Sequence, residues 1–496
     1  GKRGRDVVQA WSDTSGVVWT VRATERARYR IAFDYAAPAA AVLRLTVAGR
    51  QLDAALAPTG GETSFTTSSV GEVALEPGEY VMTVRPTTAG GADAVRLRAV
   101  GFRSLLGQDA ADVVDSVVRR PTRKEVAAIE RERVLAAARR YLREAPITVT
   151  AVRAVRSAGG PHDYYSEGDY WWPNPLSPDS PYVRRDGETN PDNFAAHRDA
   201  MRRLSLIVPA LTAAYEITGD ERYARQATAH LDAWFVAEST RMSPHLLYGQ
   251  AIKGVATGRG TGIIDTIHLV EVARAVSVLE RSGAIRAATL AGTKAWFRDY
   301  LGWMTTHAYG IDERNASNNH SAAWALQVAE FARLVGDSAR RDSTRRFFRE
   351  TLIPGQMAAD GSFPRELGRT KPYGYSLFQL DVMAMVAESL SRPDDDLWTF
   401  ATGDGRGMRR ALEFMYPYIK DRKRWPKPPD VMYGDQWPIR HPALFFGARA
   451  LGEPAYLELW RTLPADPTVE EVIRNYPVRQ PLLWLSLPDP SRPDRS

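Results

Sequence analysis

The chain has 496 residues, of which 44% are apolar, and this length predicts two or three domains rather than one ordinary hydrophobic core. Its net charge of +6 favours anionic partners, but it has neither a dense Lys/Arg block nor a nucleic-acid-binding motif, so we expect no nucleic-acid partner. No apolar run approaches the ~18–20 residues that cross a bilayer, so we expect no membrane association. The absence of cysteine excludes disulfides, thiolate zinc sites and cysteine nucleophiles.

The first part of the chain, from residue 15 to about 104, alternates apolar and polar side chains at a period of two, which is typical of β-strands. Gly, Pro, Thr and Ala separate six predicted strands, at residues 17–22, 27–33, 42–47, 71–75, 80–85 and 94–100. Six short strands at this spacing predict an antiparallel β-sandwich or jelly roll. We assign residues 1–108 to this all-β accessory domain.

The rest of the chain has helical periodicity. A charged amphipathic helix is predicted at residues 122–144, within a helical linker at 109–150. From about residue 192, turn signals follow apolar helical patterns and precede more polar ones, at Gly219, Gly283, Gly336, Asp394 and Gly452. A buried helix, a tight turn and an outer helix, repeated about five times, predict an all-α (α/α) toroid over residues 151–496. An irregular helical bundle is the alternative.

The most aromatic segment lies between the linker and the repeats, at residues 162–190. It has neither helical nor strand periodicity, and it contains Tyr164, Tyr165, Tyr170, Trp171 and Trp172. Aromatic faces stack on the C–H faces of pyranose rings, and a long loop in a compact domain is usually functional. We therefore interpret the segment either as a sugar-binding loop or as a plug at the base of the toroid.

A cluster of amide and imidazole side chains begins one of the helical patterns, at Asn318-Asn319-His320-Ser321. Asn and Ser are good N-cap residues, so a capping cluster is the simplest interpretation. Caps do not explain a histidine beside Asn319, or the basic and aromatic stretch that follows at residues 363–378. That stretch contains Arg365, Arg369, Lys371, Tyr373 and Tyr375.

Four motifs, in this order, together resemble the alginate-lyase-type polysaccharide lyases over about residues 155–450. They are Tyr170-Trp171-Trp172-Pro-Asn-Pro, the 247–265 stretch with Gln250 and Arg259, Asn318-Asn319-His320-Ser321, and Arg369-Thr-Lys-Pro-Tyr373-Gly-Tyr375-Ser. The resemblance implies an incomplete α/α toroid that cleaves uronate polymers by β-elimination, with an anionic polysaccharide as its partner. In the first domain, Gly78-Glu-Tyr80 and the run after it resemble the penultimate strand of jelly-roll carbohydrate-binding modules. A purely structural role for that domain stays open.

The residue types suit β-elimination independently of the resemblance. Removing the C5 proton of a uronate requires a site that neutralises the adjoining carboxylate and stabilises the aci-carboxylate that forms, as an amide and a guanidinium can do. A base must take the proton and an acid must protonate the leaving O4, and in β-1,4-linked mannuronate or glucuronate one tyrosine could serve both steps. The eight histidines show no metal-ligand spacing and no dense Asp/Glu cluster appears, so we expect neither a metal nor a cofactor.

The resemblance also implies roles for individual residues. Asn319 and Arg369 would neutralise the carboxylate, His320 would transfer a proton and Tyr375 would be the catalytic tyrosine. Tyr373 is the alternative to Tyr375, because the family more usually has a histidine where this chain has Gly374. The predicted substrate-binding residues are Tyr164, Tyr165, Trp171, Trp172, Gln250, Arg259, Asn318, Arg365 and Tyr373.

Two other classes of function stay open. A glycoside hydrolase would need two carboxylates across a groove, with Glu167, Asp169, Glu366 and Asp435 as candidates. A carbohydrate-binding protein without catalysis would explain the aromatic residues but leave His320 and Tyr375 without a role. We favour a lyase on alginate or glucuronan, expected to be secreted or periplasmic as catabolic lyases with a sugar-binding module usually are. The sequence sets no oligomeric state.

Overall fold

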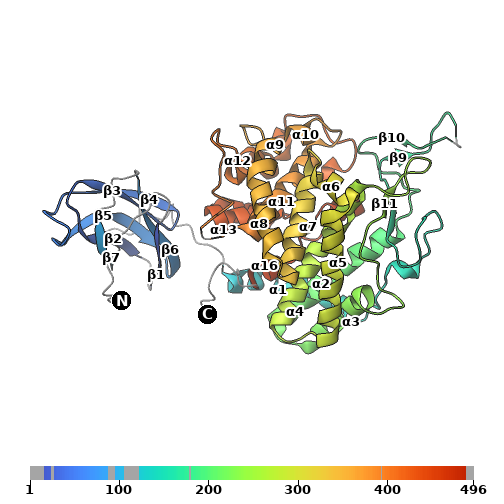
Figure 1. Cartoon of the computed structure of the whole chain (residues 1–496), viewed down its shortest axis with the longest axis horizontal. Helices are drawn as coiled ribbons and strands as arrows, with labels where there is room; N and C mark the ends of the chain where they lie inside the picture. The colour runs from blue at the N-terminus through green and yellow to red at the C-terminus, as the bar shows by residue number, and fades with distance from the viewer. Residues whose placement is uncertain are drawn as a thin grey trace. The chain divides into compact units, whose positions relative to one another are not determined.

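The computed structural model describes residues 16–23, 27–87, 95–104, 122–177, 180–392, 394–476 and 478–486 (Figure 1). The chain forms two compact units, residues 1–120 with 451–454, and residues 121–450 with 455–496. Among the residues described, no helix combines the length and the apolar character needed to cross a membrane.

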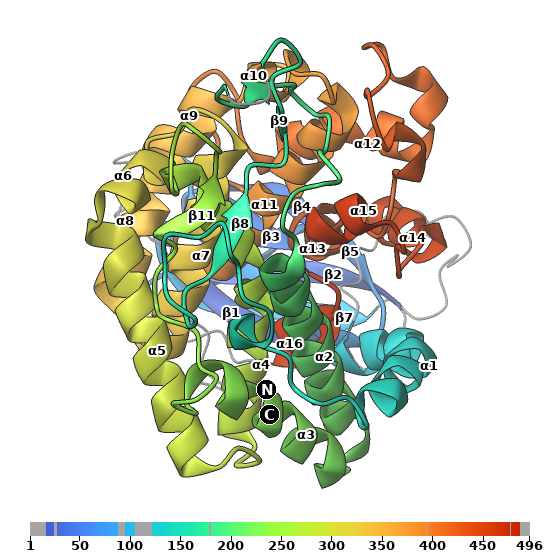
Figure 2. The same ribbon diagram turned by 90° about the vertical axis from the view of Figure 1, so that its right-hand side faces the viewer.

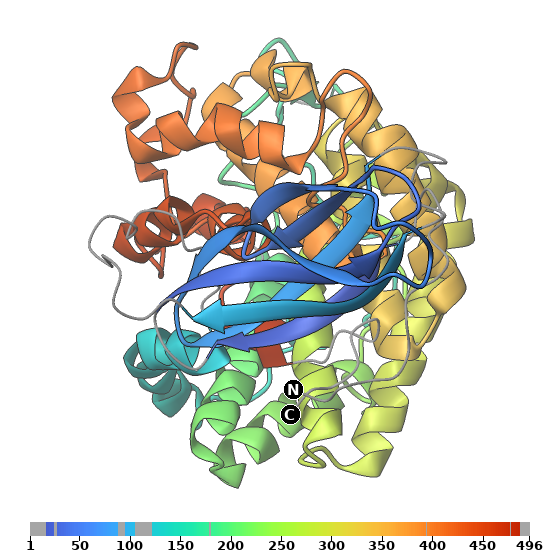
Figure 3. The ribbon, with the colours of Figure 1, turned by 90° about the vertical axis from the view of Figure 1, so that its left-hand side faces the viewer.

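The first unit is an antiparallel β-sandwich, as the sequence predicts (Figure 3). One sheet has the order β1 (Val17–Ala23), β6 (Gly78–Pro86), β3 (Ala41–Val47) and β4 (Arg50–Leu56), and the other has the order β5 (Thr66–Leu75), β2 (Ala27–Ala36) and β7 (Arg96–Ser104). Alternate side chains point inward, so that Ile31 and Phe33 of one sheet share a single core with Leu43 and Leu45 of the other.

Strand β4 was not among the predicted strands. It follows β3 through a two-residue turn in which Ala48 and Gly49 have positive φ, 51° and 74°. Its inward positions include Ala54, and alanine gives a weak strand signal. The predicted strand 94–100 is observed as β7, which begins at Arg96, and residue 94 lies outside the described residues.

The second unit is mainly helical, which confirms the predicted α/α toroid (Figure 2). From residue 196 on, its longer helices are, in chain order, α2 (Ala196–Thr218), α3 (Glu221–Phe235), α4 (Leu269–Arg281), α5 (Ala287–Thr306), α7 (Asn319–Val335), α8 (Ser338–Phe347), α11 (Pro372–Leu390), α12 (Met408–Lys420), α13 (Pro442–Leu451) and α14 (Pro454–Thr462). Consecutive helices pack together in α2 with α3, α7 with α8, and α11 with α12, whereas α4 packs against α2 and α7. Helices α7 and α11 are almost wholly buried, whereas α3, α5 and α8 lie at the periphery.

All five predicted tight turns are observed, four of them at a glycine. Gly219, Gly283, Gly336 and Gly452 have φ between 68° and 78°, the left-handed conformation that ends a helix and that glycine adopts without a Cβ clash. The turn predicted at Asp394 has no such glycine, but backbone hydrogen bonds in both directions between Arg392 and Asp395, at 3.0 and 3.2 Å, close a tight turn there. It lies within a longer connection, residues 391–407, between α11 and α12. Pro393 lies outside the described residues.

Shorter elements complete this unit. Helix α1 (Arg123–Tyr141) starts at a capping box between Thr122 and Glu125 and packs against α2 and α16 (Pro481–Ser486). The remaining elements are η2 (Val149–Ala151), η3 (Gly260–His268), α6 (Ala308–Arg314), η4 (Phe348–Leu352), α9 (Ile353–Gln356), α10 (Pro364–Leu367), η5 (Arg422–Arg424), η6 (Gly434–Gln436) and α15 (Glu470–Arg474).

The aromatic segment is not structureless. Strand β8 (Tyr165–Glu167) pairs in parallel with β11 (Tyr248–Ala251), and β9 (Trp171–Trp172) pairs antiparallel with β10 (Val183–Arg184). These strands have two to four residues, which is too short for a periodicity to appear in the sequence. Pairing therefore gives a defined position to the described part of this segment, residues 162–177 and 180–190, here called the aromatic hairpin.

Two glycines test the conformational argument for the turns. We expect Gly336→Ala to destabilise the helical unit by about 1 kcal/mol, because alanine is strained at a φ of 78° although no atom lies near the added Cβ. The matched control is Gly302→Ala, inside α5 and equally free of contacts, which should stabilise by about 0.5–1 kcal/mol. Urea unfolding measures both changes, and equal effects of the two would contradict the argument.

Candidate active site

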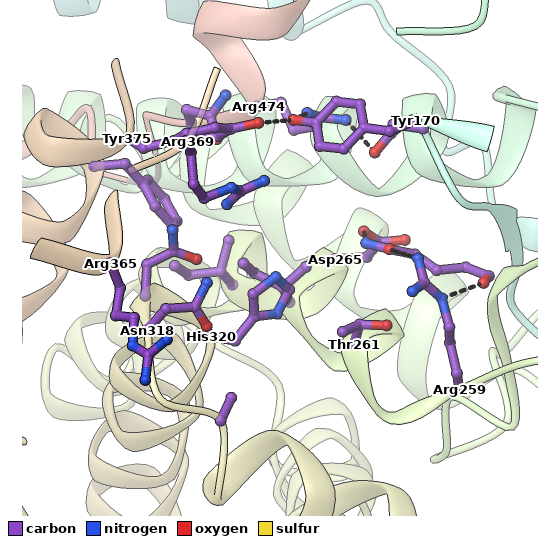
Figure 4. Close-up of a pocket in the computed structure, with 18 of the residues that line it drawn as sticks. Tyr170, Arg259, Thr261, Asp265, Asn318, His320, Arg365, Arg369, Tyr375 and Arg474 are labelled. Atoms are coloured by element: carbon purple, nitrogen blue, oxygen red, sulfur yellow. Dashed lines mark hydrogen bonds and ion pairs between the residues drawn. The ribbon is translucent and has the colours of Figure 1, made fainter. Parts of the chain in front are cut away.

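A cavity of about 430 Å³ lies where α7, α11, α15, η3 and the aromatic hairpin meet (Figure 4). Six arginines and two aspartates are among the residues that line it: Arg184, Arg198, Arg259, Arg365, Arg369, Arg474, Asp169 and Asp265. The excess of cations makes this pocket suited to an anionic ligand.

The N-terminus of α7 enters the pocket with Asn318, Asn319 and His320. The side chain of Asn318 makes no capping hydrogen bond, so the predicted capping role is wrong for this residue. Instead, the backbone N–H of Asn319 donates to Oε1 of Glu366 at 2.9 Å. Glu366 is buried, and burial raises its pKa. Hydrogen bonds from Asn319 and the charge of Arg369 partly oppose this rise. A carboxylate from α10 therefore caps this helix and fixes Asn319.

His320 is oriented by a second buried carboxylate. Its Nδ1 lies 2.7 Å from Oε1 of Glu313, on α6, and only 1% of the Glu313 surface is exposed. A carboxylate accepts only, so Nδ1 carries a proton and donates it to Glu313. This arrangement leaves Nε2 as the nitrogen that can serve a ligand in the pocket.

Tyr375 reaches the pocket from the first turn of α11. Its hydroxyl donates to the hydroxyl of Tyr170 at 2.7 Å, and the guanidinium carbon of Arg369 lies 3.8 Å from the centre of its ring. Burial raises the pKa of Tyr375 far above that of an ordinary tyrosine, and the charge of Arg369 only partly opposes this. Tyr375 is therefore a neutral phenol in the ligand-free pocket at neutral pH.

Arg369 holds the aromatic hairpin against α11. Its Nη2 and Nε donate to the two carboxylate oxygens of Asp186 at 2.8 and 3.3 Å, and the Thr370 hydroxyl donates to the Asp186 carbonyl at 2.7 Å. Burial would raise the pKa of Asp186, but hydrogen bonding to Arg369 and the charges of Arg369 and Arg184 lower it to about 2. Asp186 is thus ionised, and it neutralises Arg369 while no ligand is bound.

Beneath these residues runs a buried row of alternating charges. The row contains Lys371, Glu471, Arg474, Asp169, Arg198 and Asp265, each in an ion pair with the next. At the Asp265 end of the row, the partners are neutral hydroxyl groups: Asp265 also accepts hydrogen bonds from Tyr164 at 3.0 Å and from Ser166 at 2.6 Å. Alternation leaves no buried charge without a partner, which is the condition for keeping so many ions out of water.

The far end of the pocket is formed by Gln250, Arg259 and Trp171. The side-chain oxygen of Gln250 accepts from Arg259 at 2.9 Å, and its amide nitrogen donates to Asp265 at 3.3 Å. The guanidinium of Arg259 lies 5.9 Å from the centre of the Trp171 ring. Figure 4 shows Arg259 across the pocket from His320 and Tyr375, so the pocket extends well beyond one reacting group.

Of the thirteen predicted site residues, nine line the pocket and four do not. The nine are Asn318, Asn319, His320, Arg369, Tyr375, Arg365, Trp171, Gln250 and Arg259. The other four make structural contacts: Tyr164 donates to Asp265, Tyr165 to Glu167, Trp172 to the Glu188 carbonyl, and Tyr373 to the Tyr418 carbonyl. Tyr373 and Tyr375 are thus separated by the structure, and Tyr375 is the one that faces the pocket.

Several pocket residues were missed by sequence reasoning. Tyr170 was noticed only as part of an aromatic run, although it contacts Tyr375 directly. Arg198, Asp265 and Arg474 belong to the row of alternating charges. Asp265 ends the 247–265 motif but was given no role, and no local pattern marks the two arginines. His268 lies buried in the pocket lining, where burial and the nearby charges of Arg202, Arg479, Arg474 and Arg198 lower its pKa well below that of an ordinary histidine.

The carboxylates required by a glycoside hydrolase are not arranged for that role. Glu167 accepts from Tyr165 and from the Phe194 N–H, and Glu366 caps α7. Asp169 lines the pocket but is paired with two arginines, and Asp435 is exposed on η6. Within the described part of the chain, no three or more His, Asp or Glu side chains gather as a metal site would require.

Comparison with known proteins identifies the family. A family model described as alginate lyase matches residues 148–425. The chain belongs to the alginate lyase family. Among solved structures, an alginate lyase from Bacteroides ovatus is 31% identical, with a TM-score of 0.63, over 73% of this chain and 94% of that one.

More distant structures were also found. An alginate lyase from Sphingomonas species A1 is 16% identical, with a TM-score of 0.42, over 66% of this chain and 87% of that one. A CBM35 domain from Cellvibrio japonicus is 23% identical, with a TM-score of 0.19, over 21% of this chain and 77% of that one. A search of curated protein sequences gives no match. As a member of the alginate lyase family, the chain is a polysaccharide lyase, and this replaces the hydrolase alternative.

The ion pair that holds the aromatic hairpin should show itself as a pH-dependent stability. Because the pKa of Asp186 is lower in the folded than in the unfolded protein, its contribution is present above pH ~4 and is lost as pH falls toward 2. We expect Asp186→Asn to cost about 1 kcal/mol at pH 7, allowing for solvent screening of this partly exposed pair. Thermal unfolding of both proteins at pH 7 and pH 3 measures the difference, and a gap that widens at pH 3 would contradict the assignment.

Proposed function

We propose that this alginate lyase family member cleaves a β-1,4-linked uronate polymer, mannuronate-rich alginate or glucuronan, by β-elimination. The observation that carries the proposal is the convergence of Asn319, His320, Arg369 and Tyr375 on one arginine-lined pocket. These residues supply the amide, imidazole, guanidinium and phenol that the reaction requires. Because catabolic lyases with an attached sugar-binding module are usually exported, we also propose that the protein is secreted or periplasmic.

The first step is neutralisation of the substrate carboxylate. The amide of Asn319 and the guanidinium of Arg369 are the donors for the C5 carboxylate, and both are held in place before substrate arrives. Charge builds up on this carboxylate only as the C5 proton leaves, so fixed donors stabilise the transition state more than the ground state. Substrate then takes over part of the role that Asp186 has toward Arg369 in the ligand-free pocket.

The proton transfers follow from the two proton-bearing groups. Nε2 of His320 takes the C5 proton, since Glu313 behind Nδ1 stabilises the imidazolium that forms. The C5–H electron pair forms the C4–C5 double bond as the C4–O4 bond breaks. Tyr375, a neutral phenol in the free pocket, donates its proton to O4, and its hydrogen bond with Tyr170 supports the phenolate that remains. One product has a new reducing end, and the other has a 4,5-unsaturated uronate at its non-reducing end.

The tyrosine pair gives a test with an internal control. We expect Tyr375→Phe to lower kcat by about 10²–10⁴, the range for loss of one acid or base group, with folding intact because only a hydroxyl is removed. Tyr373→Phe should keep most activity, because its hydroxyl bonds the Tyr418 carbonyl outside the pocket. Ultraviolet absorbance of the unsaturated uronate measures both. Release of reducing ends without that absorbance would contradict elimination, and an active Tyr375→Phe protein would contradict the assigned acid.

The carboxylate behind His320 gives a second test. We expect Glu313→Gln to lower kcat by about 10-fold to 100-fold, because the amide keeps the shape but supports the imidazolium less well. Asp312→Asn, a change at a neighbouring exposed carboxylate on α6, is the control and should leave kcat unchanged. An unchanged kcat for Glu313→Gln would contradict the role assigned to Glu313.

A further inference from the structure

A dense set of exposed cations lies outside the pocket, at residues 420–427, here called the basic segment. It contains Lys420, Arg422, Lys423, Arg424 and Lys427, and all five are exposed. Asp421 is its one acidic residue, and the Asp421 carboxylate accepts the backbone N–H of Lys423 at 3.0 Å within the turn.

Most of the positive charge of the basic segment faces solvent, although the charge of Arg422 also acts on the Asp430 carboxylate. None of its five cations forms an ion pair with a described residue, whereas the arginines of the pocket floor are paired. The Arg422 side chain donates to the Gly434 carbonyl, and this neutral contact cancels no charge. Like charges held close together repel one another, so the segment is suited to a polyanion that lies across it.

The basic segment is tied to the same helical turn that carries Tyr375. The Trp425 ring lies 5.2 Å from the ring of Tyr373, and the Asp430 carboxylate accepts the backbone N–H groups of Tyr373 and Gly374, both at 2.9 Å. The Val431 N–H donates to the Thr370 carbonyl at 3.1 Å. The segment therefore has a fixed place beside the start of α11.

Helical geometry sets the distance between the segment and the pocket. Residues two apart in a helix point about 200° apart, so Tyr373 and Tyr375 lie on nearly opposite sides of α11. Tyr375 lines the pocket and Tyr373 contacts the segment's Trp425. A helix with its side chains is roughly 10–12 Å across. A polymer that leaves the pocket over this turn meets the basic segment within about one helix width.

We propose that the basic segment is a distal binding surface for polyuronate, which holds carboxylates of sugar units beyond those in the pocket. The inference rests on the proposed function for the identity of the polymer. Each exposed contact is weak and salt-sensitive, and several act together only when one chain reaches both places. The surface therefore acts on long substrates and has no effect on short ones.

The experiment removes four charges without removing a hydrogen bond. The variant carries Lys420→Gln, Lys423→Gln, Arg424→Gln and Lys427→Gln, and Arg422 stays because it donates to the Gly434 carbonyl. A matched control removes four exposed arginines of α1 and the residues after it, by Arg131→Gln, Arg139→Gln, Arg140→Gln and Arg143→Gln. Both proteins lose the same net charge, so a general electrostatic effect would appear equally in both.

The expected result is a roughly tenfold rise in KM on polymer at low salt, with kcat unchanged, KM on tetrasaccharide unchanged and the difference lost at high salt. The α1 control should match the wild type. An equal rise in both variants, or an equal rise on tetrasaccharide, would overturn the proposal.

Binding keeps this inference separate from the proposed reaction. In the Tyr375→Phe background, affinity for polyuronate should fall in the basic-segment variant and not in the control. If the wild type forms no unsaturated product yet its binding depends on the segment, the reaction is wrong and the surface stands. If DNA or anionic lipid vesicles bind the segment as tightly as polyuronate does, the surface belongs to another partner and the proposal is overturned.

Discussion

The buried row of alternating charges beneath the pocket is the constraint on which the rest of the site depends. Six ionised side chains from α2, η3, α11, α15 and the aromatic hairpin alternate in sign, so each is neutralised only while its neighbours are present. Removing one partner of a buried pair leaves an uncompensated charge, which typically costs 3–5 kcal/mol. The row therefore fixes the positions of these elements relative to one another more closely than hydrophobic packing alone would. It also supports Tyr170, through Arg474, and Gln250, through Asp265.

Two buried glutamates extend the same principle to the reacting groups. Glu366 holds the backbone at Asn319 and Glu313 holds the ring of His320, and each comes from a short helix next to α7. Because both carboxylates are almost fully buried, neither can relax into water, and the two side chains they orient are fixed before substrate binds. Preorganised donors of this kind are the main source of electrostatic catalysis. The pocket thus combines a rigid base with an aromatic hairpin that is held by ion pairs, from Arg369 to Asp186 and from Arg198 and Arg474 to Asp169.

Sequence reasoning identified the parts of the site that are contiguous in the chain. Two short motifs, one with Asn319 and His320 and one with Arg369 and Tyr375, contain residue types that indicate proton transfer and carboxylate binding. The structure brings both motifs to one cavity. Arg198 and Arg474 were missed because a buried ion pair between distant residues leaves no local pattern. Tyr164 was assigned to substrate because composition alone does not show that its ring points into the core, toward Asp265. In the fold, β4 was missed for a similar reason, since alanine fills one of its inward positions.

The position of Arg474 in the chain has a consequence for biosynthesis. Asp169 is paired with Arg198, which is made soon after it, and with Arg474, which is made about 300 residues later. At about 5–20 residues per second, a ribosome needs roughly 15–60 s to cover that interval. During this time the toroid helices can emerge and pack while Asp169 has only one of its two arginine partners. The emerging protein thus has a helical scaffold whose central ion pairs stay incomplete until α15 is made.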